Sequence, residues 1–418
     1  MPDSMLEPSH YFPCYQPIVD LVTGEISGYE ALARYRDDAG ELRSAGALFH
    51  SPNVDRSDLL AIDRHIRRAA LKHFAQNQDA GYVTVNISPE WVERLKGDAS
   101  PTIAMIEAAG IDPARVVVEI TEGQGELSQI QRVVADYHRA GMRVAIDDFG
   151  AGASQLDRIE ALKPDIIKLD MQLFKKASRG GLTADVTLAA TKIAERIGCD
   201  IVCEGVETEE ELHFGIECGA RFIQGYIFHP AQAQLLPPHQ TCASARALQQ
   251  SFLKRKAERL RAMAVHNRSL SESVLHMRQQ LLEENTETLS APELSEQGIL
   301  RYYLCCADGT QISDNIEVTA QGFECQPWGR SCNWSHRPYF PLLVALETSF
   351  TRKLVISDSY RDTMTHKLCR TFGTHLDKNR ILLVDVLVND DVLYVGLDSK
   401  GKSTSGAPEI ANKTRTRV

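Results

Sequence analysis

Two adjacent aspartates, Asp147 and Asp148, follow a short apolar run in the stretch RVAIDDFGAG at residues 143–152. Carboxylates so close together repel each other when both are ionised, and burying either one without a partner is unfavourable. One explanation is structural, with Asp148 capping a following helix and Asp147 solvated. The other is that both bind cations, because Mg²⁺ and Mn²⁺ prefer oxygen ligands. Other residues of the chain are needed to decide between these two explanations.

Polar side chains stand at the ends of other apolar runs in the same half of the chain. They are Glu30, Asn86, Glu119, Glu122, Lys168, Asp170, Glu204, Glu207 and Gln224. If these runs are neighbouring strands, their carboxylates converge and need cations to stay ionised. Two metal ions about 3.5–4 Å apart are a recurring device for phosphoester hydrolysis. In such a site one of the two adjacent aspartates would bridge the two ions and the other would bind only the second, while Lys168 would orient or deprotonate the attacking water or only balance charge.

Eight apolar runs supply the strands that would position these residues. They are FPCYQPIVD, EISGYEALARY, YVTVNIS, RVVVEIT, RVAIDDF, DIIKLD, DIVCEGV and RFIQGYIF. Helix-like stretches separate most of them, and eight such repeats over about 230 residues predict a (β/α)8 barrel with its chemistry at the carboxyl ends of the strands. Only LVTGE lies between the first two runs, which is too short for a parallel crossover and predicts a hairpin. The predicted fold class is therefore α/β, a modified TIM barrel with an antiparallel first strand.

The sequence divides into four segments. We expect a barrel at residues 1–243, a linker helix at 244–298, a second α+β domain at 299–400 and a disordered tail at 401–418. The linker has a heptad pattern, with Leu253, Leu260, Asn267, Val274 and Leu281 spaced by seven. This pattern predicts a parallel coiled coil between two chains, in which a core asparagine fixes the register. The alternative is a single amphipathic helix that packs on its own domain.

Composition limits the class of protein. The chain has 418 residues and a formal net charge of -10, which argues against binding to DNA or to an anionic membrane surface. It contains neither a long apolar segment nor an apolar signal core, so we expect no membrane insertion and a cytoplasmic location. The ten cysteines form no CxxC pair and no zinc-like spacing, and most are expected to be free core residues.

The ordered motifs resemble the EAL-domain family, phosphodiesterases that act on the bacterial second messenger cyclic di-GMP. Glu30-Ala31-Leu32 is the signature, within YEALAR. The other motifs are VNIS (85–88), EITE (119–122), DDFGAG (147–152), KLD (168–170), EGVE (204–207) and QGY (224–226). The resemblance covers roughly residues 10–240. It is the order of all the motifs that is specific, since EAL alone is three common residues.

The resemblance implies two metal ions per barrel, Mg²⁺ or Mn²⁺, with Ca²⁺ binding but supporting little turnover. The first ion would be held by Glu30, Asn86, Glu119 and Asp147, and the second by Asp147, Asp148 and Glu204. Catalysis would depend on Lys168 at the nucleophilic water, on Glu30 and Glu204, and on Glu122, which holds the loop after the fifth strand. The dinucleotide would contact Gln16, Arg34, Asp170, Glu207 and Gln224. A guanidinium suits a phosphate because it can bind two oxygens at once.

The second domain resembles the PAS-like and Cache-like sensor domains of signalling enzymes, through DGTQISDN, RPYF (337–340) and SDSYRD (357–362). This looser resemblance implies a small antiparallel sheet with a pocket for an unidentified small molecule. Candidate pocket residues are Trp334, Arg337, Tyr339, Tyr360 and Asp385. The same aromatic and charged residues would also suit an ordinary core.

The predicted function is metal-dependent hydrolysis of cyclic di-GMP to linear pGpG in a homodimer regulated by the sensor. The competing hypothesis is a barrel that binds the messenger without cutting it. A third, in which the barrel only supports the sensor, does not need the intact carboxylate set. Degenerate family members typically lose metal ligands or the lysine, and all of these residues are present here. The sequence therefore favours the enzyme.

Overall fold

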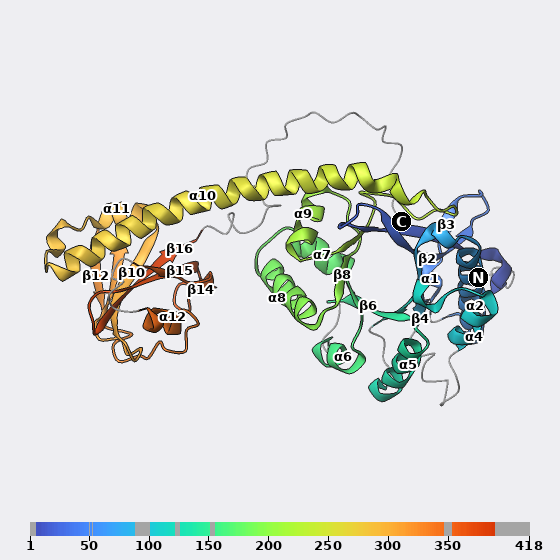
Figure 1. Ribbon diagram of the computed structural model, residues 1–418, viewed down its shortest axis with the longest axis horizontal. Helices are drawn as coiled ribbons and strands as arrows, with labels where there is room; N and C mark the ends of the chain where they lie inside the picture. The colour runs from blue at the N-terminus through green and yellow to red at the C-terminus, as the bar shows by residue number, and fades with distance from the viewer. Residues whose placement is uncertain are drawn as a thin grey trace.

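The computed structural model describes residues 6–49, 51, 53–87, 101–121, 126–150, 155–346 and 353–388. An N-terminal barrel and a C-terminal sheet domain lie at opposite ends of one long helix (Figure 1). None of the described helices combines the length and the apolar character needed to cross a membrane. All ten cysteines are free and most are buried, in agreement with the sequence.

The barrel strands coincide with the eight predicted runs. They are β1 (Tyr11–Asp20), β2 (Ile26–Arg36), β4 (Tyr82–Ile87), β5 (Val116–Ile120), β6 (Arg143–Phe149), β7 (Ile166–Leu169), β8 (Asp200–Cys203) and β9 (Phe222–Gln224). The order β1-β9-β8-β7-β6-β5-β4-β2 closes because β1 also pairs with β2. β1 is antiparallel to both β2 and β9, whereas the other barrel neighbours are parallel. The modified barrel with an antiparallel first strand is thus confirmed.

Helices surround the barrel on the outside (Figure 1). They are α2 (Arg56–Gln76), α4 (Pro101–Ala109), α5 (Leu127–Arg139), α6 (Gln155–Leu162), α7 (Met171–Ala177), α8 (Leu182–Ile197) and α9 (Glu209–Glu217). Shorter elements are η2 (Pro8–His10), α1 (Gly46–Phe49), η3 (Gln78–Ala80), η4 (Pro113–Arg115) and η5 (Pro238–Thr241). The sequence did not predict β3 (Leu42–Ser44), which pairs with the end of β2 outside the closed ring. Apolar faces of the helices pack on the outer faces of the strands in one continuous core.

The C-terminal domain is built on an antiparallel sheet. Its strands are β10 (Ile299–Cys306), β11 (Asn315–Thr319), β12 (Gly322–Gln326), β13 (Val355–Ile356), β14 (Tyr360–Arg361), β15 (Leu368–His375) and β16 (Arg380–Leu387). The order is β12-β11-β10-β16-β15-β13, with β14 also paired to β15. The helical elements are η6 (Thr286–Thr288), α11 (Ala291–Glu296) and α12 (Phe340–Ala345). Gly309, with φ +91°, lies in the turn that follows β10. The predicted tail at 401–418 lies outside the described residues.

The linker is a single helix, α10 (Cys242–Leu282). Its C-terminal half is occupied by its own domain, because Leu270, Val274 and Met277 are buried against the sheet. The predicted coiled coil over the whole heptad pattern is therefore wrong in this half, where the alternative of an amphipathic helix packed on its own domain holds. Leu253 and Leu260 remain 63% and 48% exposed, so only the first half of the pattern is open to a partner.

Candidate active site

Alternation along the strands explains how the polar residues reach one mouth. Seven strands contribute a buried apolar cluster: Ile18, Tyr82, Val117, Ala145, Ile166, Val202 and Phe222. β2 contributes Gly28, where a Cβ would lie 2.5 Å from the Tyr82 ring. Two residues further along five of these strands come Glu30, Glu119, Asp147, Lys168 and Gln224. Residues two apart share a face of a strand, so the polar groups lie above the apolar layer at the carboxyl ends.

Asp147 and Asp148 serve one site because β6 is irregular at this point. In a regular strand adjacent side chains point to opposite faces. Here the pairing of β6 with β7 shifts between Ile146 and Phe149, and Asp148 has φ 55°, in the left-handed region. The next turn depends on Gly150, whose φ is +112° and whose Cβ would lie 2.0 Å from Leu173. As a result, carboxylate oxygens of Asp147, Asp148 and Glu204 lie within 4.8 Å of one another.

Lys168 lies at the centre of the carboxylates. Its Nζ is 2.5 Å from Glu204 Oε1, 2.9 Å from Glu119 Oε1, 3.2 Å from Asp147 Oδ1 and 3.3 Å from Glu30 Oε2. Its side chain is only 2% exposed, so this ammonium is desolvated and held by four carboxylates. The contacts fit the expected charge-balancing role, and they also hold Nζ at the floor of the mouth, where it can donate to a bound water.

One ammonium does not neutralise this mouth. Burial by itself would lower the pKa of Lys168, but the surrounding carboxylates raise that pKa well above its usual value. Burial raises the pKa of Glu204 to about 8, and burial together with Asp147 raises the pKa of Asp148 to about 6. Burial and the nearby Glu30 raise the pKa of Glu119 well above its usual value. Excess negative charge of this kind favours binding of cations.

Glu119 gives a direct test of whether metal ions fit this site. It is fully buried, and neither of its carboxylate oxygens has a hydrogen-bond partner among the described residues, although Oε1 lies near Lys168. A buried carboxylate normally has its oxygens paired or bound to a metal. The all-oxygen donor set around it suits Mg²⁺ or Mn²⁺. The residues present therefore fit a divalent cation.

Glu30 is held by amide groups on both sides. Asn86 Nδ2 donates to Glu30 Oε1 at 3.0 Å, and Gln224 Nε2 donates to Glu30 Oε2 at 2.7 Å. Although burial opposes ionisation, Lys168 and these amide donors keep the pKa of Glu30 below its usual value. Gln224 also donates to Gln16 Oε1 at 3.2 Å. The structure thus brings Gln16, Asn86 and Gln224 together around Glu30.

A cleft of about 1160 Å³ opens beside this mouth. Its wall includes Asn86, Asp147 and Asp148, and it extends along the end of β2 to Arg34, Arg56 and Arg67, with Asp63 beside Arg67. Arg34 donates to the carbonyl of Ala33 at 2.9 Å, which positions its guanidinium at the cleft. Of the three arginines, only Arg34 was predicted from the sequence. Asp63 and Arg67 are buried on α2 and joined by an ion pair, and their spacing of four on an apolar face was the available signal.

Two predicted residues lie outside the carboxylate cluster, and a third is not among the described residues. Asp170 is the N-cap of α7, where its side chain accepts from Leu173 N at 2.8 Å. Glu207 is exposed, and its Oε1 lies 2.6 Å from Lys175 Nζ. Glu122 lies outside the described residues. Contact of these three residues with a substrate or a loop stays a prediction.

The five predicted sensor residues lie in one network of the C-terminal domain. The Arg337 guanidinium lies 5.8 Å from the Trp334 ring centroid and 4.9 Å from that of Tyr360. Tyr360 donates to Asp385 Oδ1 at 3.1 Å, and Tyr339 is buried in the cluster that Trp334 borders. The ligand pocket at these residues stays a prediction.

Sequence reasoning missed the buried cation at the centre of this network. Arg301 is 2% exposed, donates to Asp362 at 2.6 Å and has its Nε 3.6 Å from Asp385 Oδ2. Arg301 is within RYYL, which reads as half-exposed strand, and both acidic partners are distant in sequence. Nothing local in the sequence signalled its burial.

The fold and the site together define a TIM-barrel protein with a carboxylate-rich mouth whose residues fit divalent cations. Residues 3–231 match the family model described as the EAL domain, and residues 246–394 match the model described as an EAL-domain associated signalling protein domain. The chain belongs to the EAL-domain family. The resemblance stated from the motifs is therefore confirmed.

Similar proteins extend over both domains. The uncharacterised EAL-domain protein YkuI of Bacillus subtilis is 28% identical over 398 residues, 90% of this chain and 93% of that protein. The crystal structure of B. subtilis YkuI in complex with substrate c-di-GMP and calcium has a TM-score of 0.80 at 26% identity, covering 92% of this chain and 98% of that one. PdeN of Escherichia coli, a probable cyclic di-GMP phosphodiesterase, is 29% identical over 52% of this chain but only 42% of its own length.

Proposed function

We propose that this protein hydrolyses cyclic di-GMP to linear pGpG with the help of two divalent cations, Mg²⁺ or Mn²⁺. The observation that carries this proposal is the group of four carboxylates in contact with the buried Lys168, with Asp148 next to them, beside a cleft lined by arginines. Such a group is unfavourable in a protein that does not bind cations. The similarity to YkuI, whose structure contains c-di-GMP and calcium, supports the same ligand class here.

The cations would be held by the side chains that converge on the mouth. In this proposal Glu30, Asn86, Glu119 and Asp147 hold the first, and Asp147, Asp148 and Glu204 hold the second. When bound, divalent ions of this kind supply Lewis acidity that activates water and stabilises the leaving oxygen. The irregularity of β6 supports the assignment, because it brings Asp148 to the same side as Asp147 and Glu204.

Lys168 then acts on the attacking water. Its Nζ lies among the proposed ligands and not in the outer cleft, so an N–H can donate to a water positioned between them. The apolar layer beneath keeps other water out of the barrel interior. Glu30, which accepts hydrogen bonds from Asn86 and Gln224, also contacts Lys168 Nζ and helps to fix its position. This arrangement orients the water toward the phosphorus atom, whose bond to the 3′ oxygen breaks to give pGpG.

The cleft would bind the dinucleotide. Its volume of about 1160 Å³ exceeds the common range for small ligands, roughly 300–1,000 Å³, and suits a cyclic dinucleotide. Arg34 is proposed to bind a phosphate, and Gln16 and Gln224 to contact the nucleotide at the opposite side of the mouth. Asp170 and Glu207 are proposed as further contacts. Each would have to leave the partner that it has here.

The engagement of Asp170 with α7 and of Glu207 with Lys175 favours a second candidate, a receptor that binds cyclic di-GMP without turnover. A turnover assay separates the two. The protein would be incubated with cyclic di-GMP and Mg²⁺ or Mn²⁺, and the products separated by chromatography, with Glu30→Ala as the inactive comparison. Metal-dependent formation of pGpG by the wild type alone supports the enzyme. Tight binding without product would establish the receptor.

Regulation is proposed to come from the C-terminal domain, with Trp334, Arg337, Tyr339, Tyr360 and Asp385 lining the site of an unidentified small molecule. α10 is the physical connection, because it packs on the sheet at one end and on α9 at the other, where Lys256 Nζ and Glu217 Oε2 are 2.7 Å apart. A cytoplasmic homodimer remains the proposed assembly. A second chain could contact the first half of the heptad pattern, where Leu253 and Leu260 are exposed.

A further inference from the structure

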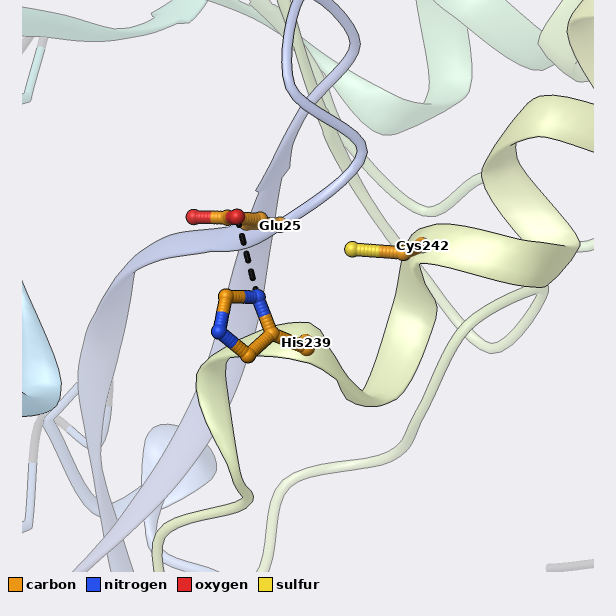
Figure 2. Close-up of side chains that lie close together, drawn as sticks. All are labelled: Glu25, His239 and Cys242. Carbon is orange, nitrogen blue, oxygen red and sulfur yellow. Dashed lines mark ion pairs between the residues drawn. The ribbon is translucent and has the colours of Figure 1, made fainter.

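Three metal-ligating side chains meet where α10 begins (Figure 2). Glu25 belongs to the turn between β1 and β2, His239 lies on η5, and Cys242 is the first residue of α10. His239 Nδ1 lies 2.9 Å from Glu25 Oε1, and Figure 2 shows the Cys242 thiol directed toward this pair. One ligand atom from each residue lies within 4.8 Å of the other two. The side chains come from three elements and share one small volume.

The separations are close to those of a metal-binding triad. Bonds to Zn²⁺ of about 2.0–2.2 Å for nitrogen and oxygen and about 2.3 Å for sulfur place tetrahedral ligands roughly 3.3–3.8 Å apart. Since no two of the ligand atoms are more than 4.8 Å apart, the thiol has to approach by at most about 1 Å, a shift that side-chain rotation can provide. His239 is 77% and Glu25 41% exposed, so solvent can reach the site and fill a fourth position.

The backbone around the three ligands is already fixed. Thr241 Oγ1 donates to the Gly24 carbonyl at 2.8 Å, and Gln249 Nε2 donates to the Leu21 carbonyl at 2.6 Å. Gly24 has φ +78°, and a Cβ there would lie 3.3 Å from the Cys242 Cα, so the turn lies directly against the start of the helix. A ligand set on a fixed scaffold loses little conformational freedom when it binds a metal.

We propose that Glu25, His239 and Cys242 form a binding site for a thiophilic divalent cation such as Zn²⁺, which ties the β1–β2 turn to the first turn of α10. The donor set of one oxygen, one nitrogen and one sulfur suits Zn²⁺ and differs from the all-oxygen mouth. The site is also separate in space. Glu25 precedes β2, whereas Glu30 lies further along that strand toward the mouth.

Co²⁺ is the probe that distinguishes this site from the barrel mouth. A thiolate bound to Co²⁺ gives an intense near-ultraviolet charge-transfer absorption, whereas all-oxygen ligands do not. The full chain, without a polyhistidine tag and with its thiols reduced, would be titrated with Co²⁺ in excess Mg²⁺. We expect an absorption that saturates at one equivalent and is displaced by Zn²⁺.

Substitutions assign the ligands. Cys242→Ser should abolish the absorption, and His239→Ala and Glu25→Gln should each weaken Co²⁺ binding by at least about tenfold, since even residues around a metal's ligands contribute 10–100-fold. The matched control is Cys325→Ser, which removes an exposed thiol elsewhere and should change nothing. An absorption that is absent from the wild type, that survives Cys242→Ser, or that is lost in Cys325→Ser overturns the proposal.

Hydrogen exchange gives a second measurement that does not depend on the thiol. Zn²⁺ should slow amide exchange in the β1–β2 turn and the first turns of α10 in the wild type but not in His239→Ala. His239 is largely exposed, so its replacement should leave the fold intact, which circular dichroism would verify. Equal slowing in the wild type and in His239→Ala would show that Zn²⁺ acts elsewhere and would reject the site.

Discussion

Replacing Lys168 by alanine tests the electrostatics of the mouth and its chemistry in one variant. The ammonium contacts four carboxylates at 2.5–3.3 Å with its side chain 2% exposed. Removing one partner of a buried ion pair generally costs about 3–5 kcal/mol, although the carboxylates can take up protons and limit the loss. At roughly 2–4 °C per kcal/mol for a domain of this size, the metal-free variant should melt about 6–20 °C lower than the wild type.

Divalent cations should offset much of this loss. Without the ammonium the carboxylates have no competing cation, so the variant should bind Mn²⁺ more tightly than the wild type does. Saturating cation, about 100 times its Kd, adds about 2.7 kcal/mol of stability. The added cation should not restore catalysis in the variant. If Nζ positions the attacking water, kcat should fall by about 10²–10⁴-fold while KM changes little.

The measurements are melting curves with and without Mn²⁺ and steady-state formation of pGpG. Lys192→Ala is the matched control, because its pair with Glu195 is at the surface, with side chains 70% and 66% exposed, and is worth at most about 1 kcal/mol. Wild-type turnover in Lys168→Ala would reduce the lysine to a charge-balancing role. Unchanged metal-free stability would refute the argument that the carboxylates depend on this ammonium.

Four further outcomes are expected. Excess chelator should abolish turnover, which chromatography of the products would show. Ca²⁺ should support binding of cyclic di-GMP, measured by calorimetry, but little product, because its longer and more flexible bonds position two oxygens less tightly. Gly150→Ala should lower stability by about 1–3 kcal/mol in denaturant melts and reduce activity, since its φ of +112° and its contact with Leu173 exclude a Cβ. Arg301→Met should cost about 3–5 kcal/mol by removing the buried cation that pairs with Asp362 and Asp385, as calorimetric melting would show. The double variant Leu253→Ser, Leu260→Ser should self-associate more weakly in sedimentation without melting at a lower temperature, because both side chains are exposed. A monomeric wild type would contradict the homodimer.

The barrel and its mouth were predictable because both follow from local periodicity. Apolar runs bounded by turns identified all eight strands, and the positions of Glu119, Asp147 and Lys168 at the ends of these runs placed them at the mouth. The short connection before Glu30 was enough to predict the antiparallel pairing of β1. A parallel barrel directs the carboxyl ends of its strands to one end, so convergence of the polar residues needed no information on tertiary contacts.

Features that depend on tertiary contacts between residues distant in sequence were not predictable. The heptad pattern gives α10 an apolar stripe, but Val274 faces its own sheet and Leu253 faces solvent, and the pattern is the same for both. In the sequence Arg301 resembles a surface residue, and its burial depends on Asp362, which comes next to it only in the folded chain. Glu25 and Cys242 approach each other only because β1 and β2 form a hairpin that turns at the start of the helix. Spacing along the chain contains none of these distances.

The antiparallel first strand has a consequence for communication through the molecule. In a parallel barrel every strand ends at the mouth, but β1 begins near the mouth, where Gln16 receives a hydrogen bond from Gln224, and ends at the turn that lies against α10. Its pairing joins Gln16 to Glu30 in the same register. One strand therefore connects the start of the helix that leads to the signalling domain with two residues of the proposed catalytic mouth. In the proposed regulation, a change in how α10 is held against this turn would act on β1 directly, without passing through the outer helices of the barrel.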